Sequence, residues 1–234
     1  MTKQARIHKL LADSPVGEDI ERMSFATIDR EAPDHGFNPG QWEVVRRMIH
    51  TTGDVPILEK VRLSDDAVDA GVAALTAGKP IYVDANMSKS GLSLSRLRSA
   101  CGSYEQNDIH CHVADADVAK NAATLKLPRS VAAVRKAKPL FIEGGIAVFG
   151  NAPTGLLEMS RMIIEEGVKP ALVIGVPVGF VNVVESKAEL LELEVPHIVL
   201  EGRRGGSPIA VSILHALCTV AAGRKEKEIQ KEAL

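Results

Sequence analysis

A chain of 234 residues that is 45% hydrophobic is long enough to bury the core of one α/β domain. Aromatic residues make up only 3% and the formal net charge is −2, which argues against a nucleic-acid-binding protein with stacking platforms and a basic surface. The three cysteines form no CxxC pair, no uninterrupted apolar run approaches a membrane span, and the first residues lack a signal peptide's apolar core, so we expect a reduced, cytoplasmic protein.

Apolar periodicity and turn residues divide the chain into helices and strands. The clearest helix start is Asn38 as N-cap with Pro39 at the first helical position, and Ser64 and Ser207 are candidate N-caps of later helices. In chain order the predicted elements are helices 17–28 and 39–52, strand 57–63, helix 65–77, strand 80–84, a polar loop 85–91, strand 109–113, helices 116–125 and 130–137, strand 145–149, a helix ending at 166, strand 170–176, helix 185–194, strand 197–200 and a helix from 208 that ends in a charged, solvated tail at 224–234.

The repeated alternation of strand and helix predicts the fold class. We expect an α/β, three-layer sandwich with a mostly parallel central sheet covered by helices on both faces, in a single domain over residues 1–234. Ligands of such open sheets bind beyond the carboxyl ends of the strands. The loops that follow the strands are therefore candidate binding sites.

The end of the second helix places two arginines near a histidine. Arg46 lies four residues and Arg47 three residues before His50, and both spacings bring side chains to the same helix face. Imidazole titrates near neutral pH, so this stretch predicts a site for a large anion beside a proton donor or acceptor. Taken alone, the stretch is more typical of a His50 that interacts with the helix dipole while the arginines face solvent.

Three loops beyond strand ends are candidate binding sites. In 150–154, the helix that follows Asn151 offers free N–H groups to an anion, although Asn151 also fits a plain N-cap. In 175–182, Gly175 and Gly179 permit close approach of a ligand or another backbone, or serve turn geometry. In 202–207, two arginines among glycines suit a carboxylate or phosphate.

Other patterns are weaker. His110 and His112 would point to one face of a strand and Cys111 to the other, and no further ligands have metal spacing, so we expect strand packing and no metal site. No Walker loop, no dinucleotide fingerprint and no Ser-His-Asp arrangement is present. Asp84, at a strand end, is a possible site carboxylate.

Together, seven short segments resemble one family, the precorrin-8X methylmutases, also called cobalt-precorrin-8 methylmutases. They occur in the family's order between about residues 21 and 222, which leaves 1–16 and the 224–234 tail outside the match. The segments are RMSF (22–25), RRMIH (46–50), DANM (84–87), GNAPT (150–154), GVPVGFV (175–181), ESK (185–187) and GRRGGS (202–207).

The resemblance implies an isomerase of cobalamin (vitamin B12) biosynthesis. It moves a methyl group from C11 to C12 of a tetrapyrrole, (cobalt-)precorrin-8, to give hydrogenobyrinate or cobyrinate. No redox cofactor or methyl donor is needed, because the methyl group moves within one molecule. The resemblance further implies a homodimer with the pocket near the subunit interface.

The site residues follow from the same resemblance. His50 matches the proton donor or acceptor, Ser24 and Arg47 match substrate contacts, and Arg129 is a looser match. The residue chemistry adds Asn151, Arg203, Gly205, Gly206 and Ser207 as substrate-binding candidates, because the many carboxylates of the substrate would pair with the clusters Arg46/Arg47, Lys126/Arg129 and Arg203/Arg204.

Segment 87–91 departs from the family, which usually has an apolar residue after the methionine. The residues leave open whether the substrate carries cobalt. Two other functions also remain open: a module that binds a tetrapyrrole without converting it, and an enzyme that acts on a phosphorylated metabolite at the helix starts near Asn151 and Ser207.

Overall fold

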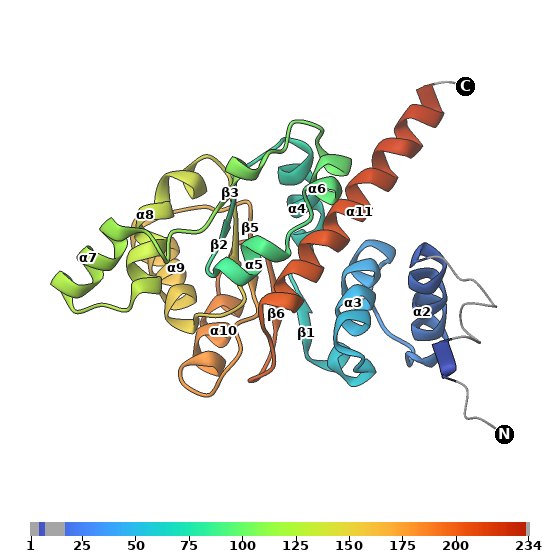
Figure 1. Cartoon of the computed structure of the whole chain (residues 1–234), viewed down its shortest axis with the longest axis horizontal. Coiled ribbons are helices and arrows are strands. Elements are labelled where there is room, and N and C mark those ends of the chain that lie inside the picture. Colours follow the sequence, from blue (N-terminus) through green and yellow to red (C-terminus); the bar gives the residue numbers. More distant parts are fainter. Residues whose placement is uncertain (1–4, 8–16, 233–234) are drawn as a thin grey trace.

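A six-stranded sheet lies at the centre of the molecule (Figure 1). The computed structural model describes residues 5–7 and 17–232. The strand order is β1-β6-β5-β4-β2-β3; β1 pairs with β6 antiparallel, and every other pair is parallel. The strands are β1 Val61–Leu63, β2 Ile81–Val83, β3 Ile109–His110, β4 Ile146–Phe149, β5 Leu172–Gly175 and β6 His197–Leu200. The prediction of a mostly parallel sheet is confirmed.

Helices cover both faces of this sheet. They are α2 Gly17–Glu31, α3 Pro39–Thr52, η1 Val55–Lys60, α4 Ala67–Thr76, α5 Asn86–Gly91, α6 Leu94–Ala100, η2 Gln106–Asp108, α7 Ala116–Leu125, α8 Arg129–Ile142, α9 Pro153–Glu166, α10 Val183–Leu191 and α11 Ser207–Glu232. Alternate residues of β4 show the layering: Ile146 and Val148 join one buried cluster with α3, α4, α6 and α11, and Ala147 and Phe149 join the other with α8, α9 and α10. The predicted three-layer sandwich is therefore confirmed.

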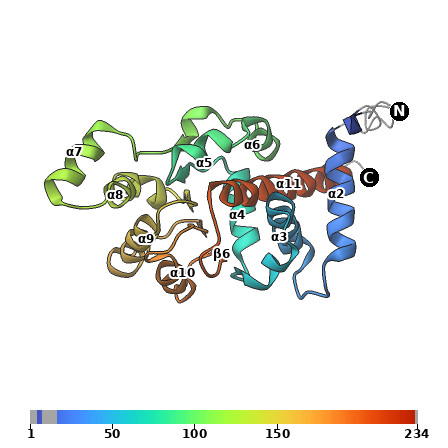
Figure 2. The same cartoon turned by 60° about the horizontal axis from the view of Figure 1, so that its bottom comes forward.

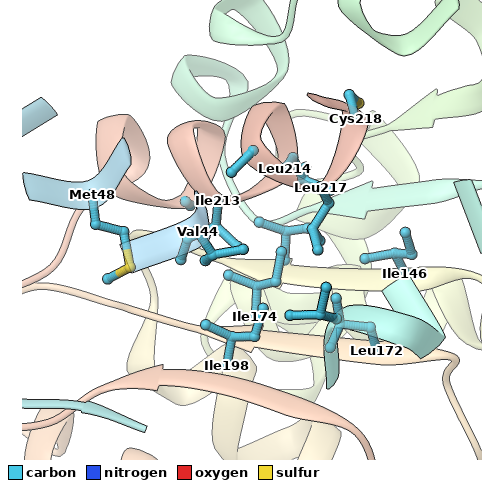
Figure 3. Packing of buried hydrophobic residues seen from close by; sticks show 14 of the residues in the cluster. Val44, Met48, Ile146, Leu172, Ile174, Ile198, Ile213, Leu214, Leu217 and Cys218 are labelled. Carbon is cyan, nitrogen blue, oxygen red and sulfur yellow. The ribbon is translucent and has the colours of Figure 1, made fainter. Parts of the chain in front are cut away.

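The long helix α11 lies against β4 and β5 and also packs on α3, α4, α5 and α6 (Figures 1 and 2). Figure 3 shows Ile213, Leu214 and Leu217 of α11 among Ile174 and Ile198 of the sheet. By length and composition α11 could cross a membrane, but 61% of its most apolar window is buried inside the protein. Packing in the core accounts for that apolar composition.

Several helix boundaries follow local signals. Asn38 caps α3 through a reciprocal capping box with Gln41, and Gly53 ends α3 in the left-handed conformation, φ 63°. α7 spans Ala116–Leu125, and α9 ends at Glu166 before Gly167, as predicted. These ends are determined by residues next to them in the chain.

Other boundaries differ from the prediction. Most of the predicted strand 57–63 is the 3₁₀ helix η1, whose first turn contains Pro56, so only Val61–Leu63 pairs with β6. Ser64 bonds the side chain of Asp66, and Asp66 holds the N-cap position of α4. The polar loop 85–91 contains α5, helix α6 was not predicted, strand 109–113 pairs only over Ile109–His110, and α11 already begins at Ser207.

Candidate functional site

His50 and Ser24 meet where α3 packs on α2. Ser24 Oγ lies 2.8 Å from His50 Nδ1, although the two residues are 26 positions apart in the sequence. The Phe25 ring contacts the imidazole edge-on, with centroids 5.2 Å apart. Both Ser24 and His50 line a cavity of about 410 Å³, here called the His50 cavity, together with Met23, Thr27 and Glu31. The structure thus brings the predicted acid–base residue and a predicted substrate contact into one cavity.

Arg46 and Arg47 are both paired within the fold. Arg46 bonds Asp29 at 2.9 Å and also Glu43. Arg47, only 6% exposed, donates to Glu21 at 2.9 Å. The two guanidinium carbons lie 4.6 and 5.0 Å from the centroid of the Phe25 ring. The arginines are therefore not the freely solvated pair that the alternative interpretation requires.

Glu21 is the carboxylate that holds Arg47. Burial opposes its charged form, but Arg47, Arg96 and His50 outweigh that effect, so the pKa of Glu21 is lowered. Arg96 approaches the same carboxylate oxygen at 3.5 Å. Glu21 therefore stays ionised and fixes the position of the Arg47 side chain.

Arg47 lines a second cavity, here called the Arg47 cavity. It has a volume of about 360 Å³, and its lining residues are Arg47, Thr51, Met87, Gly91, Ser207, Pro208, Val211, Ser212 and His215. The predicted contacts Arg47 and Ser207 share this cavity, whereas His50, three residues after Arg47 on α3, lines the other. One helix thus presents an acid–base group and a cation to two cavities.

The N–H groups of loop 150–154 are already bonded within the fold. Asp84, only 2% exposed, accepts hydrogen bonds from the backbone of Gly150 at 3.0 Å, Asn151 at 2.8 Å and Ala152 at 2.6 Å. Burial raises the pKa of Asp84, and these bonds act in the opposite direction. The N-cap position of α9 is Ala152, so Asn151 is not the cap, and its side chain is exposed. The N–H groups predicted to bind an external anion serve Asp84 instead.

Lys187 of α10 holds loop 202–207 by hydrogen bonds to its backbone. Lys187 is 1% exposed, and its Nζ donates to the carbonyls of Gly202 at 2.8 Å and Arg204 at 2.7 Å. Burial lowers the pKa of Lys187 to about 8. The exposed Arg203 lies over the Phe180 ring, 5.5 Å from its centroid, and Arg204 pairs with Asp54. Arg203 is therefore the arginine of this loop that faces solvent without an ion pair to the described residues.

Gly205 and Gly206 serve backbone packing. A Cβ atom on Gly205 would lie 2.2 Å from the carbonyl oxygen of Val176, and Gly206 has φ 127°. The N–H of Gly206 donates to the same Val176 carbonyl at 2.9 Å. Close backbone approach explains these glycines without a ligand. A substrate contact of either residue stays a prediction.

Arg129 begins α8, next to Ser130, whose Oγ lies 2.7 Å from Thr154 Oγ1 in the 150–154 loop. It is exposed at the start of α8, and α8 lies at the opposite end of the molecule from α2 and α3 (Figures 1 and 2). Arg129 lines neither the His50 cavity nor the Arg47 cavity. Its role in substrate binding stays a prediction.

The His110–His112 segment adds no ligand cluster. His112 Nδ1 lies 2.9 Å from Asp115 Oδ2, and β3 ends at His110, so the predicted strand geometry does not extend to Cys111 and His112. Across residues 5–7 and 17–232, no group of three or more His, Cys, Asp or Glu side chains could hold a metal ion.

Two residues of this arrangement were not singled out from the sequence, and a third, Lys187, was noted only as part of the ESK segment. Glu21 accepts from the Arg47 side chain, Lys187 donates to the backbone carbonyl of Arg204, and His215 lines the Arg47 cavity. His215 lies inside the apolar stretch of α11, and Lys187 lies among apolar residues of α10. A polar residue on the buried face of an apolar helix is the signal that would have found the last two.

Comparisons with known proteins identify the family. The family model for precorrin-8X methylmutase matches residues 19–220. Cobalt-precorrin-8 methylmutase of Leptospira interrogans is 43% identical over 91% of this chain and 97% of its own length, and precorrin-8X methylmutase of Pseudomonas aeruginosa is 40% identical over 87% and 95%. The crystal structure of precorrin-8X methyl mutase from Thermus thermophilus superposes with a TM-score of 0.81 at 45% identity, covering 89% of this chain and 98% of that one. The chain therefore belongs to the precorrin-8X methylmutase family, the isomerases that catalyse methyl migration in cobalamin biosynthesis.

Proposed function

We propose that His50 is the proton donor and acceptor when this enzyme moves a methyl group from C11 to C12 of (cobalt-)precorrin-8. The observation that carries the proposal is the 2.8 Å contact of Ser24 Oγ with His50 Nδ1 at the wall of a cavity. A hydroxyl on Nδ1 fixes the ring orientation and leaves Nε2 for the substrate, because the described residues make no other hydrogen bond to this ring. Protonation of the tetrapyrrole makes the ring electron-poor, and the methyl group then shifts to the adjacent carbon.

The basic side chains would bind the carboxylates of the tetrapyrrole. Arg47 and Ser207 supply donors in one cavity, and Arg203 adds an exposed guanidinium at the sheet edge. Arg129 and Asn151 are exposed and would add a guanidinium and an amide to the substrate contacts.

The site would be completed by a second subunit. The cavities that hold His50 and Arg47 measure about 410 and 360 Å³, near the lower end of the roughly 300–1,000 Å³ typical of ligand pockets. A tetrapyrrole with many carboxylate arms needs more room than either. We therefore propose a homodimer in which Arg129 of one chain faces the His50 region of the other, acting in the cytoplasm without a nucleic-acid or membrane partner.

The first test is turnover by a His50 variant. We expect His50→Gln to fold, to bind hydrogenobyrinate, and to lose about 10²–10⁴-fold in turnover, the range typical of a general acid–base group. Single-turnover incubation with precorrin-8, followed by the corrin absorbance, measures the loss. His35→Gln, which alters a histidine stacked on Trp42, is the matched control.

The same experiment separates the alternatives. Near-normal turnover by His50→Gln would rule out the proton-transfer role. Tetrapyrrole binding without conversion by the unmodified protein would instead indicate a carrier.

A further inference from the structure

The Arg47 cavity contains a histidine that the proton-transfer mechanism does not use. His215 of α11 is half-buried and lines this cavity with Arg47, Thr51, Ser207 and Ser212. Its Nε2 lies 3.0 Å from the backbone nitrogen of Ser93, the N-cap of α6. The ring is therefore held in one orientation by a backbone group.

The bond to Ser93 fixes the protonation of the ring. A backbone N–H can only donate, so Nε2 must accept with its lone pair, and the single proton of the neutral ring sits on Nδ1. Burial, together with the nearby Arg96 and Arg47 and against an opposing Glu21, lowers the pKa of His215 to about 4. His215 is thus neutral at physiological pH.

The Nδ1–H group is left as a donor. The described part of the chain offers this N–H group no hydrogen-bond partner. The Nδ1 atom is nevertheless not fully buried, because it is absent from the set of buried polar atoms that lack a partner. The hydroxyls of Thr51 and Ser212 donate their protons to the carbonyls of Arg47 at 2.9 Å and Ile209 at 2.7 Å, so these two groups offer a ligand no donor. His215 Nδ1 is therefore available, with Arg47 and Ser207, to bind an acceptor in this cavity.

We propose that His215 is a substrate-binding residue, a neutral imidazole that donates its Nδ1 proton to a peripheral carboxylate of the tetrapyrrole in the Arg47 cavity. This inference rests on the proposed tetrapyrrole substrate. Arg47 supplies the positive charge, and His215 adds a fixed direction without adding a second charge. The lone pair of Nε2 is occupied by Ser93, so the ring is not an axial ligand for cobalt in a cobalt-containing substrate.

Two amide variants separate binding from folding. His215→Asn places an amide nitrogen near the position of Nδ1 and loses the acceptor for Ser93. His215→Gln places its amide oxygen near the position of Nε2 and loses the cavity donor. We expect the Kd for hydrogenobyrinate to rise about tenfold in His215→Gln, with a melting temperature close to that of the parent, and to stay within about threefold in His215→Asn, which melts lower.

The titration is followed by the absorbance of hydrogenobyrinate, with His110→Gln, outside both cavities, as the matched control. A purely structural histidine gives the reverse pattern, with intact binding in His215→Gln and weakened binding in His215→Asn. That pattern would overturn the proposal, and so would equal affinities in both variants. A failure of the unmodified protein to bind hydrogenobyrinate would reject the proposed function itself.

Discussion

The polar motifs of this enzyme lie in two regions that differ in how far the fold uses their hydrogen-bonding groups. At the carboxyl edge of the sheet, Asp84 accepts the N–H groups of loop 150–154, and Lys187 donates to two carbonyls of loop 202–207. Around α3, His50 has one ring nitrogen and His215 one N–H group that the described residues leave free, and both line cavities. The fold uses the polar groups of the first region for its own hydrogen bonds, whereas the second region leaves polar groups unbonded beside cavities.

Asp84 offers the largest expected effect on stability. In Asp84→Asn, one acceptor oxygen remains for three backbone donors, and the new NH₂ group faces N–H groups. We expect a loss of about 3 kcal/mol or more in the free energy of unfolding, measured by urea denaturation. Asp65→Asn, an exposed aspartate before α4, is the control. A destabilisation below about 1 kcal/mol would mean that the edge loops are not held by this carboxylate.

Lys187 should have a smaller effect. Lys187→Met leaves the carbonyls of Gly202 and Arg204 without their donor, and we expect a loss of about 2 kcal/mol together with faster amide hydrogen exchange in 202–207. The exposed Lys169→Met is the control.

The pH dependence sharpens the Lys187 prediction. The folded pKa of Lys187, about 8, lies below its ordinary value of 10.5, so the unfolded chain binds more protons between these values. Stability of the parent relative to Lys187→Met should therefore rise as the pH increases from about 8 toward 10.5. If the difference in the free energy of unfolding between the parent and Lys187→Met does not change over this pH range, the ammonium group of Lys187 is not buried in solution.

The smallest expected effect is that of Glu21→Gln on the ligand side. We expect about 1 kcal/mol of destabilisation at neutral pH, because Arg47 keeps only the distant Glu43 at 3.9 Å, and Glu21 is partly exposed. The pKa of Glu21 is lowered in the fold, so its contribution is present above the unfolded pKa and is lost as the pH falls through the folded value. The parent should therefore lose its advantage over Glu21→Gln as the pH falls below the ordinary carboxyl pKa of 4.5, as measured by urea midpoints.

Exposed Glu59→Gln serves as the control for this variant. An advantage that persists unchanged into acid would show that the Glu21 carboxylate does not pair with Arg47 in solution.

The parts of the fold that could be predicted are set by neighbouring residues. Asn38 with Gln41 starts α3 and Gly167 ends α9, and both signals are local. By contrast, the boundary between η1 and β1 was missed: Pro56 starts the 3₁₀ turn locally, but the point where the strand begins is set by the pairing of Val61–Leu63 with β6.

The site divides in the same way. The Arg47–His50 spacing was visible on one helix, but the Ser24–His50 contact joins residues 26 positions apart and was expected only through the family resemblance. Nothing near Asn151 reveals that Asp84 takes its N–H group. The sequence shows that a motif is polar, whereas the hydrogen-bond partner of each polar group is determined by the tertiary structure.

The contact between Gly150 and α11 ties the two regions together mechanically. A methyl group on Gly150 would lie 2.9 Å from Ser207 Cα and 3.0 Å from Ala210 Cβ, so it would act as a wedge under the first turn of that helix. Ser207, Pro208, Val211, Ser212 and His215 form one wall of the Arg47 cavity, and a tilt of α11 would move all five at once. Selection for altered tetrapyrrole preference should therefore yield substitutions at the sheet edge, in positions that never touch the ligand.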